Sequence, residues 1–256
     1  GAVGHLQSVV DTPELRDAYN AGLPVVTELF LRLSQNEALF AKYKAIRESD
    51  AFASLTPVRQ RILEREIRDF RLSGAELPEE PRARVKAIGE KLSMLSQKFS
   101  ENLLDATNAY ELVLPDASRL KGIPEDTLAL YRASAQSAGK DGYRITLQYP
   151  SYLPLMKYCE DRDLRETVYK AFSTRAAEFD GGKFDNTPLI REILELRSEE
   201  AKLLGFPNYG ELSLAVKMAS SGDEVLAFLR DLAKHAKPAA ERDMAELRAF
   251  AKDELG

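Results

Sequence analysis

The sequence predicts a mainly α-helical fold, built of long antiparallel helices with a small β element. Apolar residues recur every three or four positions over most of the chain, as on one face of a helix. A Thr-Pro pair, a good N-cap and first helical residue, precedes three of these periodic segments. Only two short segments carry strand signals. The 256 residues are enough to bury a sizeable core in one or two domains.

The first predicted helix opens at Thr12-Pro13 and runs toward Ser34, and we expect Gly22 and Pro24 to bend it. A second helix follows from Asn36. Further helical segments are expected at 56–74, 124–139, 151–159, 163–176, 187–204, 207–217 and 223–255, with Pro238 a kink in the last. The two predicted strands are 109–115 and 143–150, which we expect to pair across the helix between them.

The strongest periodic segment begins after Pro81 and covers roughly six turns. One stripe of this segment is apolar, and its members are Val85, Ile88, Leu92, Leu95, Phe99, Leu103 and Ala106. The facing positions are charged: Arg84, Lys86, Glu90, Lys91, Lys98 and Glu101. We therefore predict a long packing helix that forms half of an antiparallel pair.

Composition excludes several classes of protein. The net charge is −5 and the isoelectric point is near 5.4, which argues against a general nucleic-acid or anionic-membrane surface. No apolar run is long enough to span a bilayer, so no membrane partner is expected. One cysteine precludes an internal disulfide, and a reducing cytoplasm is the natural setting. We divide the chain into a first helical region, 1–115, and a second with the strands, 116–256.

We expect no targeting signal in the terminal residues of this sequence. Residues 1–10 lack the basic and long apolar regions of a signal peptide, and the C-terminal residues resemble a retention signal only superficially. The chain starts at Gly1 without an initiator Met and stops within a helical pattern. We expect both ends to be cut from a longer protein.

The two histidines, His5 and His235, are too few for a hydrolytic zinc site, which wants three protein ligands, and His-Glu-x-x-His is absent. Asp231 and His235 stand four residues apart on one predicted helix and could share a metal. Lys234 and Lys237 flank this histidine, so we favour a solvent-facing ion pair or capping role over metal binding.

Nucleophile and phosphate-loop patterns are also incomplete. Cys159 lies in an apolar helical segment with no histidine nearby in sequence, which favours a buried inert thiol over a nucleophile. The serines lack a G-x-S-x-G elbow, and a turn explains Gly181 and Gly182. We therefore assign no catalytic residue and no metal ligand, and the substrate-binding residues stay unknown.

The remaining polar candidates have structural explanations. The carboxylates of one predicted helix lie near basic residues of the same helix, so surface ion pairing is the default. The residues concerned are Glu192, Glu195, Glu199 and Glu200, with Arg191, Arg197 and Lys202. Tyr152, Tyr158 and Tyr209 are interpreted as core aromatics whose hydroxyls reach polar partners.

Four segments together resemble the thimet oligopeptidase and neurolysin family of zinc peptidases, and most of all its bacterial oligopeptidase A group. They are HLQSVVDTPELRDAYNAGLP (5–24), IRDFRLSGAELP (67–78), YPSYLPLMKYCEDRDLRETVYKAFSTRA (149–176) and LRSEEAKLLGFPNYGELSLAVKMA (196–219). They occur in the family's order and spacing, over essentially the whole chain.

This resemblance implies a peptidase that cuts short peptides in a deep channel between two largely helical halves. The family's zinc motif and its transition-state Tyr and His lie further downstream, so no catalytic or metal residue transfers to this chain, and zinc is the cofactor of the full-length enzyme only. The chain would be a non-catalytic, amino-terminal portion that forms channel wall and restricts substrate size. Its partners would be short peptides and the carboxy-terminal catalytic half, and we expect apolar surface that this half would cover.

Within this resemblance, the turn that follows the predicted helix 187–204, here called the corner, is interpreted as a structural element that carries no chemistry. Gly205 would end a wall helix in the left-handed conformation, with Leu203 and Leu204 docked below and Phe206 and Tyr209 holding the turn in the core. The alternative function is a free-standing helical module that binds peptides or a protein partner in a groove without catalysis. A downstream His-Glu-x-x-His in the parent gene would support the peptidase, and a stop codon the module.

Overall fold

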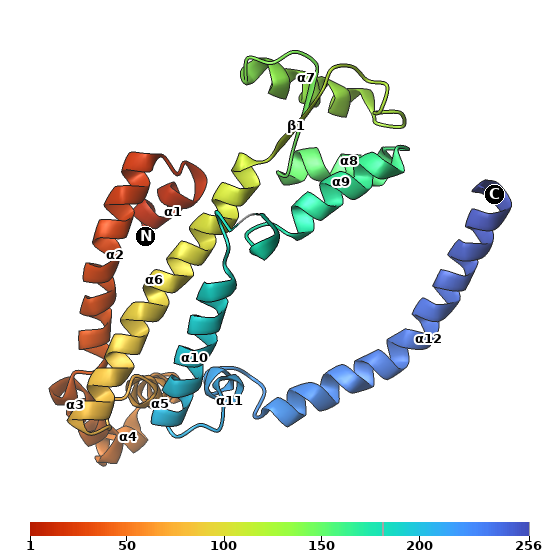
Figure 1. Cartoon of the computed structure of the whole chain (residues 1–256). Helices are drawn as coiled ribbons and strands as arrows, with labels where there is room; N and C mark the ends of the chain where they lie inside the picture. The colour runs from red at the N-terminus through yellow and green to blue at the C-terminus, as the bar shows by residue number, and fades with distance from the viewer. Residues whose placement is uncertain (181, 256) are drawn as a thin grey trace. The chain divides into compact units, whose positions relative to one another are not determined.

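A computed structural model describes residues 1–180 and 182–255, and Figure 1 shows that helices dominate it. The first helices are α1 (Ala2–Val9), α2 (Pro13–Ser34), α3 (Glu37–Glu48), α4 (Ala51–Ser54), α5 (Pro57–Leu72) and α6 (Glu79–Ala109). The later helices are α7 (Glu125–Ser137), α8 (Tyr149–Tyr158), α9 (Arg162–Ser173), the 3₁₀ turn η1 (Glu178–Asp180), α10 (Thr187–Leu203), α11 (Tyr209–Leu214) and α12 (Gly222–Leu255). The mainly α fold class is confirmed. Among the described residues, no helix is long and apolar enough to cross a membrane.

Polar side chains begin several helices as the sequence predicted. Thr56 Oγ1 accepts the backbone N–H of Arg59 at the start of α5, and Asn36 Oδ1 accepts that of Leu39 at the start of α3. The predicted starts of these helices are confirmed. The helices α1 and α4 were not predicted. Both are short, and α1 has no side-chain N-cap, so their local signals are weak.

The described residues divide into two compact units. Unit 1 comprises Gly1–Phe30 and Ala87–Leu196, and unit 2 comprises Leu31–Lys86 and Arg197–Gly256. Each unit therefore combines segments from distant parts of the chain, and both units include residues from either side of position 115. The division at residue 115 stays a prediction.

The two predicted strands form the small β element in unit 1. Strand β1 (Glu111–Leu114) pairs antiparallel with β2 (Tyr143–Thr146), with Leu112 opposite Ile145. The pairing across the intervening helix is confirmed. The second strand is shorter than predicted, because Pro150 lies in the first turn of α8, where its missing N–H costs no hydrogen bond.

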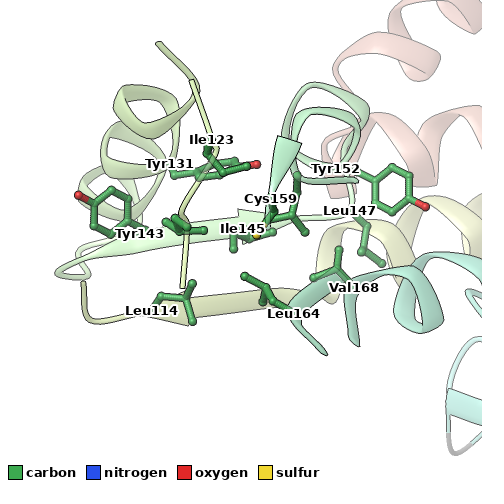
Figure 2. Packing of buried hydrophobic residues seen from close by; sticks show 12 residues of the cluster. Leu114, Ile123, Tyr131, Tyr143, Ile145, Leu147, Tyr152, Cys159, Leu164 and Val168 are labelled. Atoms are coloured by element: carbon green, nitrogen blue, oxygen red, sulfur yellow. The ribbon is translucent and has the colours of Figure 1, made fainter. Parts of the chain in front are cut away.

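The main core of unit 1 lies around this pair of strands. Side chains from the two strands, α7, α8, α9 and the loops between them meet there, as Figure 2 shows. Tyr131, Ile145, Leu155, Leu164 and Val168 are completely buried. The Tyr131 hydroxyl donates to the backbone oxygen of Ser151 at 2.7 Å, which satisfies its buried polar atom.

Helix α6 forms the predicted antiparallel pair with α2 in unit 1. Arg16 of α2 forms an ion pair with Asp105 at 2.8 Å. Farther along α2, Thr27 lies against Ser93, with 3.1 Å between their hydroxyl oxygens. Because the partner number on α6 falls as the number on α2 rises, the two helices run in opposite directions.

The apolar stripe of α6 is confirmed over most of its length but not at its end. Val85, Ile88, Leu95 and Ala106 are buried, and Leu92 and Phe99 are half-buried. Leu103 is 38% exposed, so its assignment to the buried stripe was wrong. Glu101, predicted on the charged face, is buried. Its carboxylate accepts hydrogen bonds from Asn20 at 2.7 Å and Gln97 at 3.2 Å, so polar packing replaces apolar packing there.

Unit 2 has a smaller aromatic core between α3 and α5. The rings of Phe40 and Phe70 stack with centroids 5.3 Å apart, and Ile67 and Ala75 are buried beside them. Gly74, with φ at 83°, ends α5 as predicted. Arg84 of α6 makes two 2.7 Å hydrogen bonds to the Glu199 carboxylate of α10, which is the bidentate geometry favoured by guanidinium groups.

We expect Leu95→Ala to lower the free energy of unfolding by about 2–5 kcal/mol, because Leu95 is only 6% exposed and its truncation leaves a cavity. Leu103→Ala, on the same helix and with the same change of side chain, should cost less than about 1 kcal/mol because Leu103 is exposed. Urea unfolding followed by circular dichroism measures both. Equal midpoints for the two variants would show that the buried stripe contributes no more than the exposed position.

Candidate functional site

The corner between α10 and α11 is built by backbone hydrogen bonds at the helix end. Gly205 has φ at 81°, its N–H donates to Lys202 O at 3.1 Å, and the Phe206 N–H donates to Ala201 O at 2.8 Å. These two bonds form a Schellman motif with Gly205 in the left-handed position. The predicted left-handed conformation of Gly205 at the end of this helix is confirmed.

The chain restarts in α11 directly after this turn. Asn208 Oδ1 accepts the backbone N–H of Glu211 at 3.0 Å and caps α11. The Glu211 carboxylate in turn accepts the N–H of Gly222 at 2.9 Å, the first residue of α12. Phe206 and Tyr209, predicted to lie in the core, are only half-buried. Tyr209 instead stacks against the guanidinium of Arg197, whose Cζ lies 4.8 Å from the ring centroid.

An open cavity of about 390 Å³ lies at this corner in unit 2. Its apolar lining combines Leu204 and Phe206 with Leu72 and Leu77, and Ala215 completes that side. The charged residues of its lining have partners: Arg71 Nε lies 3.0 Å from Glu76, and Arg68 pairs with Asp69 at 2.7 Å. An apolar side chain fits such a site, whereas charged groups already held in ion pairs are poorly placed for proton transfer.

No pattern in the sequence predicts that the end of α5 and the corner after α10 meet. The contribution of α5 and of the turn at Gly74 to the corner depends on tertiary packing, because Leu72 and Leu204 are far apart in sequence. The one local signal is the pair of helix-ending glycines, Gly74 and Gly205. They indicate where each helix stops but not that the two ends share a cavity.

Among the described residues, two of the four α10 glutamates that were expected in ion pairs have a basic partner, and both partners come from another helix. Glu192 pairs with Lys91 at 3.1 Å and Glu199 with Arg84, both from α6. The predicted ion pairing is correct in kind, whereas the predicted partners were wrong for these two residues. Burial raises the pKa of Glu200, and the positive charge of Arg197 opposes this rise.

The histidines lie at exposed positions on separate helices. On α12, His235 Nδ1 lies 2.8 Å from the backbone oxygen of Asp231 and 3.5 Å from its carboxylate, and both side chains are largely exposed. This agrees with the ion pair that we favoured. His5 is exposed on α1. Within 1–180 and 182–255, no group of three His, Cys, Asp or Glu residues is arranged to hold a metal ion.

Cys159 is a buried thiol, as predicted. It is 3% exposed, and its Sγ donates to the backbone oxygen of Arg119 at 3.3 Å. Burial raises the pKa of this thiol, which disfavours the nucleophilic thiolate. Gly182 has φ at 82° in the predicted turn, and Gly181 lies outside the described residues.

The aromatic predictions are confirmed in part. Tyr152 is buried and stacks on Phe172 with centroids 3.9 Å apart. Tyr158 is 50% exposed and is no core residue, since it lies at the end of α8 where the chain turns toward Cys159.

Comparison with known proteins gives two family matches. The family described as Neurolysin/Thimet oligopeptidase, N-terminal domain, matches residues 1–82, and Peptidase family M3 matches residues 155–256. The chain is 45% identical over 256 residues to the oligopeptidases A of Salmonella typhimurium and of Escherichia coli. It is 41% identical over 263 residues to the "Probable cytosolic oligopeptidase A" of Arabidopsis thaliana.

These alignments use nearly all of this chain but little of the relatives. Each includes 99% of the chain, which spans 38% of the two bacterial relatives and 37% of the plant relative.

The left-handed turn at the corner gives a prediction about stability. Gly205→Ala should lower the free energy of unfolding by about 1–2 kcal/mol, because alanine disfavours a φ of 81°. A Cβ at this position meets nothing within 4 Å, so the cost is conformational. Gly22→Ala inside α2, where space is also open, should instead stabilise by about 0.5–1 kcal/mol. Urea midpoints that move in the same direction for both variants would contradict this.

A second prediction concerns Asp161, the N-cap of α9. A hydrogen bond from Arg119, together with that from the Leu164 N–H, lowers the pKa of Asp161 to about 2. A lowered folded-state pKa stabilises the protein above the unfolded value near 3.8, and this contribution is lost as pH falls toward 2. Asp161→Asn keeps a cap acceptor but loses the ion pair. It should be less stable than the parent at pH 7, and the difference should shrink between pH 4 and 2 in urea titrations. A difference that is constant with pH would exclude this contribution.

Proposed function

Since this chain belongs to the family of the oligopeptidases A within Peptidase family M3, we propose that it forms channel wall in a zinc metallo-oligopeptidase and restricts substrate size. In this proposal, hydrolysis of short peptides is carried out by residues outside the 256 described by this sequence. The chain by itself is proposed to be inactive. The cytoplasm is the proposed location, in keeping with the name of the plant relative.

The apolar face of α12 carries the proposal that this chain is covered by more protein. Helix α12 lies inside the region that matches Peptidase family M3. Its large apolar residues are 45–66% exposed: Leu226, Phe228, Leu229, Leu232, Met244, Leu247 and Phe250. An amphipathic helix of this length is normally stabilised by burying its apolar face against other protein. The relatives are much longer than this chain, and we propose that the part of the parent protein that corresponds to their additional length covers this face.

A second uncovered face in unit 1 supports the wall function. Helix α2 exposes Val25, Val26, Leu29 and Phe30, and α1 exposes Val3 and Leu6. Val25, Val26, Leu29 and Phe30 lie within six residues of one helix, and clusters of exposed apolar residues are typical of interaction or ligand-binding surfaces. We propose that part of this face borders the substrate path.

The residues of this chain do not fit the zinc ion that the family implies. A hydrolytic zinc site has three protein ligands, whereas this sequence has two histidines and neither belongs to a metal-binding group of the described residues. In such enzymes zinc activates a water molecule and polarises the scissile carbonyl. The proposed contribution of this chain is structural, namely to shape the channel and to restrict the size of its substrates.

Two measurements test the proposal: the activity of this chain alone, and its activity after the remainder of the parent protein is added. Purified chain, dialysed after zinc loading, should retain far less than one zinc per molecule and should not cleave a quenched fluorescent octapeptide. Addition of the separately expressed remainder of the parent protein should produce cleavage, because the two parts would complete the channel. Stoichiometric zinc on this chain alone, with activity lost in His235→Ala, would overturn the proposal and make Asp231 and His235 a site.

Variants of α12 locate the contact between the two parts. Leu232→Glu should prevent complementation, because it places a carboxylate on the apolar face. Lys234→Glu, which introduces the same group on the opposite face of the same helix, should not. If the two variants complement equally well, the apolar face of α12 does not contact the remainder of the protein.

A further inference from the structure

An open cavity of about 320 Å³ lies in unit 1, at the carboxyl end of α6. Helix α9 and the segment before α10 form its other sides. Most of its lining is apolar, from Ala106, Ala109, Leu147, Ala171 and Phe184. Its volume is at the lower end of the range of small-molecule sites, which suits one or two amino-acid residues rather than a folded partner.

Arg175 provides a positive charge in this cavity, and the described part of the chain supplies no counter-ion for it. The guanidinium Cζ lies 3.6 Å from the ring centroid of Phe172, and Phe172 in turn stacks on Tyr152. Nη1 donates to Thr107 Oγ1 at 3.3 Å, whereas the buried Nε has no hydrogen-bond partner. Among the described residues, no carboxylate lies within ion-pair distance of Arg175.

This arrangement is unusual for a partly buried arginine. Buried polar groups are nearly always hydrogen-bonded, and buried charges are usually paired. Stacking on Phe172 fixes the plane of the guanidinium while leaving donors on its edge available. A planar anion in the cavity would accept hydrogen bonds from the terminal Nη1 and Nη2 groups, which, unlike the buried Nε, are not enclosed by the protein.

The electrostatics of the lining favour an anion. None of the described residues that line the cavity is Asp or Glu, and Lys183 adds a second positive charge. Burial lowers the pKa of Arg175, so the charge lies in a poorly hydrated setting where an ion pair is stronger than in water. Burial also raises the pKa of Tyr110, so this phenol stays neutral and does not repel an anion at pH 7.

We propose that this cavity binds the carboxylate of an apolar amino-acid residue, with Arg175 holding the carboxylate and the apolar lining receiving the side chain. Identifying that residue as the carboxyl end of a short peptide rests on the proposed function. Carboxylate binding itself does not. The guanidinium is the group suited to this role, because its planar fork matches the two oxygens of a carboxylate.

The probe is N-acetyl-L-leucine, which carries one carboxylate and one apolar side chain. Its binding to the 256-residue chain can be followed by saturation-transfer NMR on the methyl signals of the probe, a readout that does not depend on Arg175 and therefore serves the variants too. N-acetyl-L-leucinamide has the same shape without the charge, and inorganic phosphate has the charge without the side chain. We expect saturable binding of the first probe, and binding at least about tenfold weaker for the other two.

Variants of Arg175 distinguish a bidentate contact of its guanidinium with the carboxylate from a simple attraction between opposite charges. Arg175→Gln and Arg175→Lys should each weaken binding of N-acetyl-L-leucine by at least about tenfold, because neither offers the planar fork. Arg132→Lys is the matched control: Arg132 already pairs with Glu125 and hydrogen-bonds the Tyr143 hydroxyl, so binding should be unchanged. Thermal unfolding of each variant shows whether the fold is retained.

Three results would overturn the proposal. They are equal binding of the acid and the amide, binding unaffected in a folded Arg175→Gln chain, and tighter binding of phosphate than of N-acetyl-L-leucine. Failure here leaves the proposed function intact if the complemented protein still cleaves peptides. Conversely, the chain could bind the carboxylate and yet give no cleavage when the remainder of the protein is added. The carboxylate site would then stand, but its assignment to the carboxyl end of a peptide would not.

Discussion

The position of α10 in unit 1 depends on one buried amide, Asn186. Its backbone N–H donates to Ala176 O at 2.9 Å, and its side chain donates to Phe99 O at 3.1 Å. Its Oδ1 accepts a hydrogen bond from Asn102 at 2.9 Å. The same residue thus connects the end of α9, two positions on α6 and the first turn of α10. Ala176 holds a left-handed φ of 51°, a conformation that alanine rarely adopts and that surrounding structure must impose.

Directional polar contacts of this kind also fix the pairing of α2 with α6. The Glu101 carboxylate is only 7% exposed and is held by two amides, and Arg16 bridges Asp11 and Asp105. Apolar contacts tolerate sliding of one helix along another, whereas a buried hydrogen bond is lost when the helices shift. The packing of unit 1 therefore combines an apolar stripe with a few polar contacts that define its register.

The surfaces left uncovered bear on function more directly than the cores do. Within unit 2, α12 presents an apolar face to solvent, and within unit 1, α1 and α2 do the same. These faces, together with relatives much longer than this chain, are the reason for proposing a larger enzyme. The cavity at Arg175 differs from both faces, since its distinctive feature is an arginine that has no carboxylate partner among the described residues and lies within a mostly apolar lining.

The amino-acid sequence by itself determined the mainly α class, the two strands and the helix ends at Gly74 and Gly205, because periodicity, N-caps and left-handed glycines act over a few residues. It also indicated the family through four segments in order. Tertiary structure alone decided that Glu101 is buried while Leu103 is exposed. The Asn20 amide of α2 hydrogen-bonds the Glu101 carboxylate, and the apolar periodicity of α6 does not predict this contact. Tertiary structure alone brought Leu72 to Leu204. It alone also decided that no described carboxylate lies beside Arg175. Neither result has a local signal in the chain, because both depend on which distant residues lie close together in space.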